Sequence, residues 1–180
     1  VEVEIGGQRI DRHYGEWLHI WSQLTLPSGH DTGYSRMVGN IPALTMGKSI
    51  SDPISSETLF IPLQFWFCRN PGLALPLIAL QYHEVKINIE FNDLYDCLLY
   101  QSASTNAEYS TNLTNRPTIQ SASLWVDYIY LDSDERRRFA QLAHEYLIEQ
   151  LQYPGEETIS TISNKIKLAF NHPVKEIVWV

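Results

Sequence analysis

Histidines are the residues of this chain whose chemistry is easiest to judge from spacing, because a metal ion needs several ligands close together. The chain has six histidines, and none shows the His-X-His pair or the histidine and glutamate spacing of zinc enzymes. His13 and His19 fall in one predicted helix, where their separation turns the side chains about 120° apart. His83 and His144 each precede a glutamate and are interpreted as polar residues at strand ends. The sequence therefore predicts no metal site.

Groups for nucleophilic or acid–base catalysis are equally scattered. The serines fall mostly in loop-like stretches, and none occupies a Gly-X-Ser-X-Gly elbow. Asp93 and Asp96 could form a carboxylate pair, but they follow a predicted strand, where aspartate commonly forms turns. Gly6 and Gly7 fit a hairpin turn better than a phosphate-binding loop. The sequence predicts no catalytic residue and no cofactor.

Three further features could carry covalent or ionic chemistry. Asn112 opens an Asn-Leu-Thr sequon in a polar stretch, which makes it a candidate glycosylation site. Cys68 and Cys97 match no zinc or redox spacing, so two free buried thiols are expected, with one disulfide as the alternative. The three arginines at 136–138 lie beside acidic residues, which favours a solvated helix face over a phosphate site.

Composition places the chain among globular proteins. Its 180 residues, 44% of them hydrophobic and 19% charged, suffice for one domain with a core. The net charge of −8 argues against nucleic-acid binding as a main role. No run approaches the roughly 20 apolar residues that a membrane-spanning helix needs.

Alternation of apolar and polar residues predicts several short strands. They are expected over residues 1–10 (interrupted by the Gly-Gly turn), 58–67, 83–92, 119–131, 145–153 and 166–170. The polar stretches 28–57 and 101–118 are expected to be long loops on the surface of this scaffold.

Two short helices are expected between the strands. The first begins after Asp11 as its N-cap, because aromatic and leucine residues recur at spacings of three and four from Tyr14 to Leu24. The second covers residues 132–143, with Asp132 in the capping position. Since strand, helix and strand do not alternate regularly, a parallel sheet is not expected.

These elements predict a mainly β fold, an antiparallel jelly-roll sandwich with short helices in its loops. The chain begins in one alternating strand and stops inside another, which starts near residue 166. A strand buries its apolar side chains only against partner strands. We therefore expect the sequence to be a segment of a longer protein.

Five stretches in order resemble the major capsid proteins of the nucleocytoplasmic large DNA viruses. They are IGGQRIDRHYGEW (residues 5–17), LFIPLQFWF (59–67), LDSDERRRF (131–139), EYLIEQ (145–150) and NHPVKE (171–176). The resemblance spans nearly the whole chain, and five stretches in one order are more specific than any single motif.

The resemblance implies two jelly rolls in tandem. Residues 1–153 would be the first jelly roll without its opening strands, residues 154–163 a linker, and residues 164–180 the first strand or strands of the second. Such subunits are expected to form homotrimers, which tile an icosahedral shell together with neighbouring capsomers and minor capsid proteins.

The resemblance also implies a structural protein of the virion, assembled in the cytoplasm of the infected host, and not an enzyme. An internal membrane is expected nearby but is not spanned by the chain. Direct contact with the double-stranded DNA genome is not expected, and the negative net charge agrees with this. No catalytic, cofactor-binding or metal-binding residue is implied.

A carbohydrate-binding, lectin-like β-sandwich is the alternative function, and a cupin-type enzyme is a third. A lectin needs exposed aromatic residues in its loops, where this chain has few, chiefly Tyr34 and Tyr109. A cupin needs a histidine cluster, which the sequence lacks. Four tryptophans fall in periodic elements and are expected to be buried: Trp17, Trp21, Trp66 and Trp125.

Overall fold

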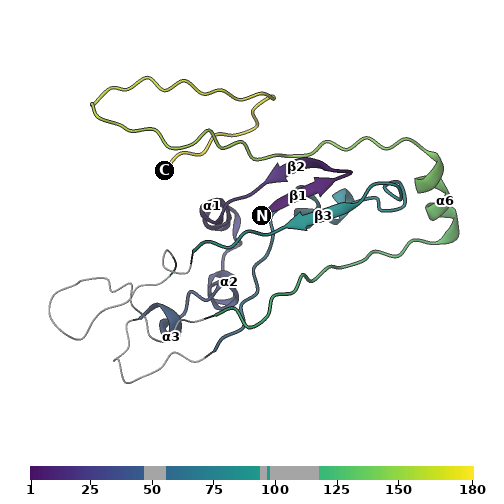
Figure 1. Ribbon diagram of the computed structural model, residues 1–180, viewed down its shortest axis with the longest axis horizontal. Coiled ribbons are helices and arrows are strands. Elements are labelled where there is room, and N and C mark those ends of the chain that lie inside the picture. Colours follow the sequence, from purple (N-terminus) through teal and green to yellow (C-terminus); the bar gives the residue numbers. More distant parts are fainter. Residues whose placement is uncertain (47–55, 94–96, 98–117) are drawn as a thin grey trace.

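A computed structural model describes residues 1–46, 56–93, 97 and 118–180, and its centre is a three-stranded antiparallel sheet (Figure 1). The strands are β1 (Glu2–Ile5), β2 (Gln8–Arg12) and β3 (Val85–Asn88), in the order β2-β1-β3. Strand β1 is therefore the central strand, paired with its sequence neighbour on one side and with a distant strand on the other.

The β1–β2 hairpin turns at Gly6 and Gly7, which confirms the predicted turn. Their φ angles are 61° and 82°, in the left-handed region that tight hairpin turns favour and that glycine enters at little cost. A Cβ atom on Gly6 would also lie 2.7 Å from Nδ1 of His83, so the turn has no room for a side chain there.

Strand β3 confirms the alternation predicted for residues 83–92 over its central part. Val85 and Ile87 are half-buried, while the residue after each of them is exposed. Ile87 pairs with Val3, which is fully buried at the centre of the sheet. The inward-facing residues of β3 thus extend the core that β1 begins.

Helix α1 (Gly15–Thr25) contains the predicted aromatic stripe but starts later than expected. Its N-cap is Tyr14, whose side chain makes no capping hydrogen bond. The prediction that Asp11 caps this helix is wrong, because Asp11 lies in β2 opposite Val3. The hairpin alternation continues past residue 10, and pairing with β1 keeps Asp11 in the sheet.

Two helices occupy much of the stretch 28–57, for which a long loop was predicted. They are α2 (Asp31–Val38) and α3 (Pro42–Thr45). Neither buries a residue, and the apolar spacing of α2 is limited to Tyr34, Met37 and Val38, which is too short to predict a helix. Glycine at position 39, with φ 84°, ends α2 in the left-handed conformation typical of a C-cap. The loop prediction is wrong for these residues, and residues 47–55 lie outside the described part.

The hydrophobic core is small and consists of Val3, Phe65 and Trp66 with partly buried neighbours. Trp66 opens the single turn α4 (Trp66–Arg69), and the 3-10 turn η1 (Pro71–Leu73) follows it. Phe65 and Phe67 stack with ring centroids 5.6 Å apart, and Trp66 meets Phe67 edge to face at 5.1 Å. This aromatic group packs against the sheet beside β1.

Residues 58–67 contribute to the core but do not form the buried strand that their composition predicts. Phe65 is fully buried, whereas Phe60 is 50% exposed. Pro62 has no N–H to donate to a strand ladder. No described strand pairs with this segment, so its first half stays outside the core.

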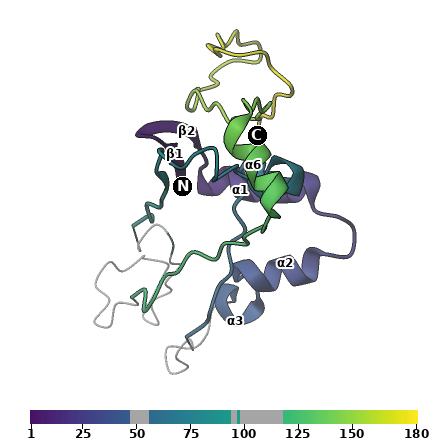
Figure 2. The ribbon, with the colours of Figure 1, turned by 90° about the vertical axis from the view of Figure 1, so that its right-hand side faces the viewer.

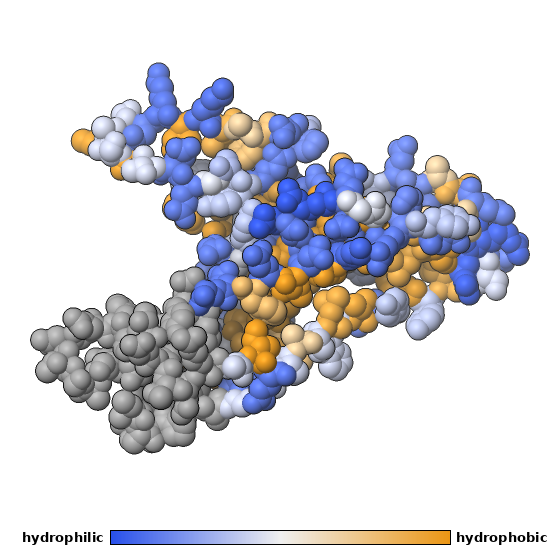
Figure 3. All heavy atoms as spheres, in the orientation of Figure 1, coloured by the Kyte–Doolittle hydropathy of each residue, from blue (hydrophilic) through white to orange (hydrophobic). Residues whose placement is uncertain are grey.

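Three further predicted strands run without a partner strand in the described part of the chain: residues 119–131, 145–153 and 166–170. Many of their large apolar side chains are exposed, for example Trp125 at 83% and Leu147 at 91%, although Ile148 packs against the core. Apolar residues are visible on the surface of the molecule in Figure 3. The alternation is present, but a strand also needs a neighbouring backbone to bond to. As elements of this structure these three strand predictions are wrong.

Helix α6 (Ser133–Gln141) lies at one end of the long axis of the molecule (Figure 1). Its prediction and its cap are confirmed: Oδ1 of Asp132 accepts hydrogen bonds from the backbone N–H groups of Asp134 at 3.0 Å and Glu135 at 2.8 Å. Seen from the side, the C-terminal segment and the pair α2 and α3 lie on opposite sides of the molecule (Figure 2). No helix in the described ranges is long and apolar enough to cross a membrane.

Removing the cap of α6 is expected to destabilise the full-length protein. Asp132→Ala should lower the free energy of unfolding by about 0.5–2 kcal/mol, because two N–H groups of the first turn lose their acceptor. Asp134→Ala is the control, since this exposed carboxylate makes only a 3.6 Å contact with Arg137 and should cost about 0.5 kcal/mol or less. Equal melting temperatures for Asp132→Ala and the wild type would contradict a capping role.

Candidate functional site

The residues singled out for chemistry do not converge in the structure. Among residues 1–46, 56–93, 97 and 118–180 there is no group of three or more histidine, cysteine, aspartate or glutamate side chains that could hold a metal ion. Asp93 is exposed, while its predicted partner Asp96 and the sequon residue Asn112 lie outside the described residues. Cys68 and Cys97 are free, as expected, but both are exposed, so the prediction that they are buried is wrong.

The four tryptophans that were expected to be buried differ in their exposure. Trp66 is buried at 4% exposure, and Trp17 and Trp21 are half-buried on α1 with ring centroids 5.5 Å apart. Trp125 is not buried as predicted, because no other segment in the described ranges packs over residues 119–131. Its neighbours Leu124 and Val126 are also exposed, which is the pattern of an unpaired strand more than that of a binding loop.

The polar residue that the structure does place at a junction is Asp11. Its side chain is almost completely buried, and Oδ1 accepts hydrogen bonds from the backbone N–H groups of Arg12 at 2.9 Å and Leu151 at 3.1 Å. Leu151 is 140 positions away in the sequence. A buried carboxylate is stable only when its oxygens have partners, and here one of the partners comes from a distant segment.

His13 completes the buried polar group beside Asp11. Its Nε2 lies 3.0 Å from Oδ2 of Asp11, and both side chains are at most 4% exposed. The imidazole stacks on the ring of Phe65 with centroids 4.4 Å apart. The pair therefore connects the sheet to the aromatic core, while Nδ1 of His13 has no hydrogen-bond partner in the described structure.

Residues 149–153 lie along β2 through side-chain contacts, and we call this set of contacts the β2 interface. Besides the Asp11 bond, Nε2 of Gln150 donates to the backbone carbonyl of Ile10. The ring of Tyr153 meets that of Tyr14 edge to face at 5.3 Å. Side chains thus bond to backbone groups at an edge of the sheet where a further strand would otherwise use a regular ladder.

An ionic group fastens the same segment from the other side. The Glu149 carboxylate forms a 3.0 Å salt bridge with Arg69 and accepts a hydrogen bond from Nζ of Lys175. The Arg69 guanidinium also lies over the ring of Trp21, 5.0 Å from its centroid. The Lys175 hydrogen bond, aided by Arg69, lowers the pKa of the Glu149 carboxyl below its ordinary value of 4.5. One carboxylate therefore links α4, the β2 interface and the C-terminal segment.

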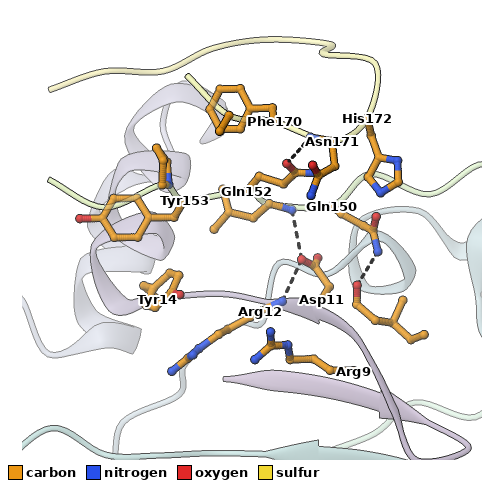
Figure 4. A pocket seen from close by; sticks show the side chains of 14 residues that line it. Arg9, Asp11, Arg12, Tyr14, Gln150, Gln152, Tyr153, Phe170, Asn171 and His172 are labelled. Carbon is orange, nitrogen blue, oxygen red and sulfur yellow. Dashed lines mark hydrogen bonds between the residues drawn. The ribbon is translucent and has the colours of Figure 1, made fainter. Parts of the chain in front are cut away.

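A cavity of about 500 Å³ opens between β2, residues 150–154 and residues 169–172 (Figure 4). Its wall is mostly polar, and Oε1 of Gln152 accepts a hydrogen bond from the backbone N–H of Asn171 at 3.1 Å within it. Arg12 stacks over Tyr14 at 5.0 Å and contacts Glu2 at 3.2 Å, so its charge is already partnered. The polar side chains at this cavity thus bond mainly to backbone groups of neighbouring segments and, for the arginines, to Glu2.

The sequence contained a signal for the β2 interface that a helix-capping interpretation of Asp11 overlooks. In a strand, residues two apart face the same side, so Asp11 and His13 share one face of an extended chain. Because both are buried in the structure, that face is the inner one. A polar pair on the inner face of a strand needs hydrogen-bond partners from another segment, but the sequence alone does not show that residue 151 supplies one.

The described part of the chain thus has one small antiparallel sheet at its centre and long extended segments at the sheet edge. Its first 132 residues match the family described as major capsid protein N-terminus, and residues 135–180 match the family described as large eukaryotic DNA virus major capsid protein. The chain belongs to the major capsid protein family of large eukaryotic DNA viruses. This confirms the resemblance drawn from the five sequence stretches and favours a capsid subunit over a lectin-like sandwich or a cupin.

Similar proteins come from viruses of several hosts. The chain is 60% identical over 181 residues to the major capsid protein of Pyramimonas orientalis virus, covering 100% of the chain and 41% of that protein. It is 48% identical to capsid protein 1 of Acanthamoeba polyphaga mimivirus, covering 99% of the chain and 30% of the relative. It is 44% identical to the major capsid protein of Paramecium bursaria Chlorella virus 1, covering 99% of the chain and 39% of that protein. The chain thus spans less than half the length of these relatives.

Two solved structures are similar to this one. They are described as the crystal structure of PBCV-1 VP54 fitted into a cryo-EM reconstruction of the virophage Sputnik, and as a quasi-atomic model of the PBCV-1 virus capsid. Each gives a TM-score of 0.53 at 38% identity, over 84% of this chain and 33% of the matched one. The matched protein is a double jelly roll, while the described part of this chain contains one small sheet.

The buried Asp11 carboxylate should hold residues 149–153 against β2. Asp11→Ala in the full-length protein is expected to lower the free energy of unfolding by about 1–3 kcal/mol, because the Leu151 N–H is left without an acceptor. Hydrogen exchange of the peptide containing Leu151 should accelerate, and Asp11→Asn, which keeps an oxygen acceptor, should accelerate it less. Glu176→Ala, at an exposed carboxylate, is the control. Unchanged exchange in Asp11→Ala would show that the contact does not hold the segment.

The ionic group at Glu149 predicts a dependence of stability on pH. Because the folded pKa is lowered, the contribution of this carboxylate is fully present above its ordinary pKa of 4.5 and is lost as pH falls through the lower folded pKa. The stability difference between wild type and Glu149→Gln should therefore be constant at neutral pH and shrink at acidic pH. Urea unfolding at pH values on both sides of 4.5 measures it, and a difference that grows on acidification would contradict the assignment.

Proposed function

We propose that this chain forms part of a virion shell, as a structural segment of a major capsid protein, and that its function is assembly and not catalysis. The observation that carries the proposal is the ordered match of two capsid-protein families along residues 1–132 and 135–180. Similarity to a solved virus capsid at 38% identity supports it.

The proposed fold is the jelly-roll sandwich of the matched double jelly-roll protein. Residues 119–131 and 145–153 would pair as strands in the complete sandwich, which would bury side chains such as Trp125 and Leu147 that are now exposed. Burial of a large apolar side chain is worth about 1.5–3 kcal/mol, so several such residues provide a strong drive to find partners. The exposed alternating segments are the physical feature that a larger β-sandwich accounts for.

We propose the division into a first jelly roll over residues 1–153, a linker over 154–163 and the start of a second jelly roll over 164–180. The linker is polar and contains Gly155 with φ 104°, and its side chains are exposed. The two family matches meet instead at the start of α6, between residues 132 and 135. Density for the full-length protein in an electron-microscopy map would decide between a boundary at α6 and one at the linker.

Self-association is part of the proposal: the full-length protein forms homotrimers that contact neighbouring capsomers and minor capsid proteins. An internal membrane would lie near the shell, and the genome would not be contacted directly. The net charge of −8 supports the last point, because binding to DNA depends on cationic surfaces. Asn112, which lies outside the described residues, remains a candidate glycosylation site.

Assembly should depend on the aromatic core. Phe65→Asp in the full-length protein is expected to abolish folded trimers, since an unpaired charge at a fully buried position costs several kcal/mol. Phe60→Asp is the matched control, because Phe60 is 50% exposed and should tolerate the charge. Size-exclusion chromatography with light scattering gives the mass of each. A stable monomeric wild type, or trimers of Phe65→Asp, would contradict the proposal.

A further inference from the structure

Four consecutive residues, 149–152, bond to two different parts of the chain, and we call them the strap. Its two inner residues bond to β2. The backbone N–H of Leu151 donates to Oδ1 of Asp11 at 3.1 Å. Nε2 of Gln150 donates to the backbone carbonyl of Ile10. Because the Asp11 side chain is buried, the first of these bonds is shielded from water and fixes the strap to the sheet.

The two outer residues of the strap bond to the C-terminal segment. Oε1 of Gln152 accepts a hydrogen bond from the backbone N–H of Asn171 at 3.1 Å. The Glu149 carboxylate accepts a hydrogen bond from Nζ of Lys175. The C-terminal segment therefore meets the strap at both of its ends.

Open space lies between the C-terminal segment and β2 beside the strap. Residues 169–172 and residues 9–12 line the same cavity of about 500 Å³ (Figure 4). The hydrogen bonds of Asn171 and Lys175 run to the strap, which in turn is bonded to the sheet. The strap is thus the bridge between the two.

We propose that the strap couples these two parts: the C-terminal segment keeps its position only while the strap is bonded to β2. The Asp11 carboxylate then controls the position of residues 171–175, although its own hydrogen bonds go to residues 12 and 151. Both partners belong to one chain, so the coupling does not depend on self-association. Its role in placing the second jelly roll, which residues 164–180 would open, rests on the proposed function.

The contacts of the C-terminal segment are too weak to hold it to a moving partner. The side chains of Lys175 and Glu149 are 73% and 43% exposed, and an exposed ion pair contributes little by itself. A bond to a segment that is already ordered loses less conformational entropy than a bond to a mobile one. The Asp11 bond supplies this order. Arg69 supports it from the other side, since it contacts Glu149 at 3.0 Å and lies 5.0 Å from the centroid of the Trp21 ring.

Hydrogen exchange of the full-length protein tests the coupling, with peptides that cover residues 149–153 and 169–176 followed separately. Asp11→Ala should accelerate exchange in both. The acceleration at 169–176 should be about fivefold or more, which is the size of a typical coupling between two sites. Arg9→Ala is the matched control, because Arg9 lies in the same strand and lines the same cavity but bonds to Glu2. It should leave both peptides at the wild-type rate. The β3 peptide reports opening of the sheet itself and should not change in either variant.

A double variant distinguishes transmission through the strap from two independent losses. Lys175→Ala alone should accelerate exchange of residues 169–176, because it removes the ion pair with Glu149. In Asp11→Ala the strap is already released, so adding Lys175→Ala should accelerate that peptide much less than it does in the wild type. Accelerations that multiply in the double variant would show independent contacts and overturn the coupling.

The outcomes separate this coupling from the proposed function. If Asp11→Ala accelerates exchange of residues 149–153 but leaves residues 169–176 at the wild-type rate, the coupling is wrong while the capsid proposal stands. A wild type that forms no trimers in light scattering overturns the proposed function, and the coupling is still measured on the monomer.

A second variant decides if Asp11→Ala fails to fold, judged by circular dichroism, or if its β3 peptide also accelerates. Gln150→Ala removes the other bond between the strap and β2 at an exposed side chain. It should accelerate exchange of residues 169–176 in the same direction, by a smaller factor. An unchanged rate in this variant overturns the coupling.

Discussion

The buried carboxylate of Asp11 is the interaction on which the arrangement of the described segments depends. It accepts a hydrogen bond from the backbone N–H of residue 151 at the edge of the sheet. It also lies 3.0 Å from the imidazole of His13, which in turn stacks on the ring of Phe65. The sheet, the aromatic core and the distant segment thus meet at one carboxyl side chain. Without that acceptor, the sheet edge at β2 would keep only the Gln150 bond to the Ile10 carbonyl and the ring contact of Tyr153 with Tyr14.

Local features of the fold follow from the sequence because they depend on neighbouring residues alone. The turn at Gly6 and Gly7 requires residues that tolerate positive φ, and the cap of α6 requires an acceptor at position 132. The aromatic stripe of α1 and the apolar alternation around Val85 can also be recognised from short stretches of sequence. The turn and the cap are confirmed because they depend on neighbouring residues alone, whereas the strand around Val85 also needs its pairing with β1.

Features that depend on distant residues were not predictable in the same way. Asp11 has the residue type of a helix cap, and only its pairing with Val3 and its bond to residue 151 show that it belongs to the sheet. Helix α2 buries no residue, and its apolar spacing is limited to Tyr34, Met37 and Val38. Residues 58–67 look like a strand although no described strand pairs with them. For the candidate site, spacing arguments found no chemistry but could not reveal the β2 interface. Family membership came from the order of five motifs, which is information that periodicity does not contain.

The bonds between β2 and residues 150 and 151 also have a consequence for the order of events during synthesis. They join positions 140 residues apart, so the hairpin must emerge from the ribosome long before its partners exist. Translation at about 5–20 residues per second leaves an interval of many seconds in which the β2 edge and its buried carboxylate are unsatisfied. Contacts of such long sequence separation also slow folding, because the loop must close before the bonds form. During that interval the nascent hairpin exposes an unpaired sheet edge, which is the kind of surface that chaperones protect.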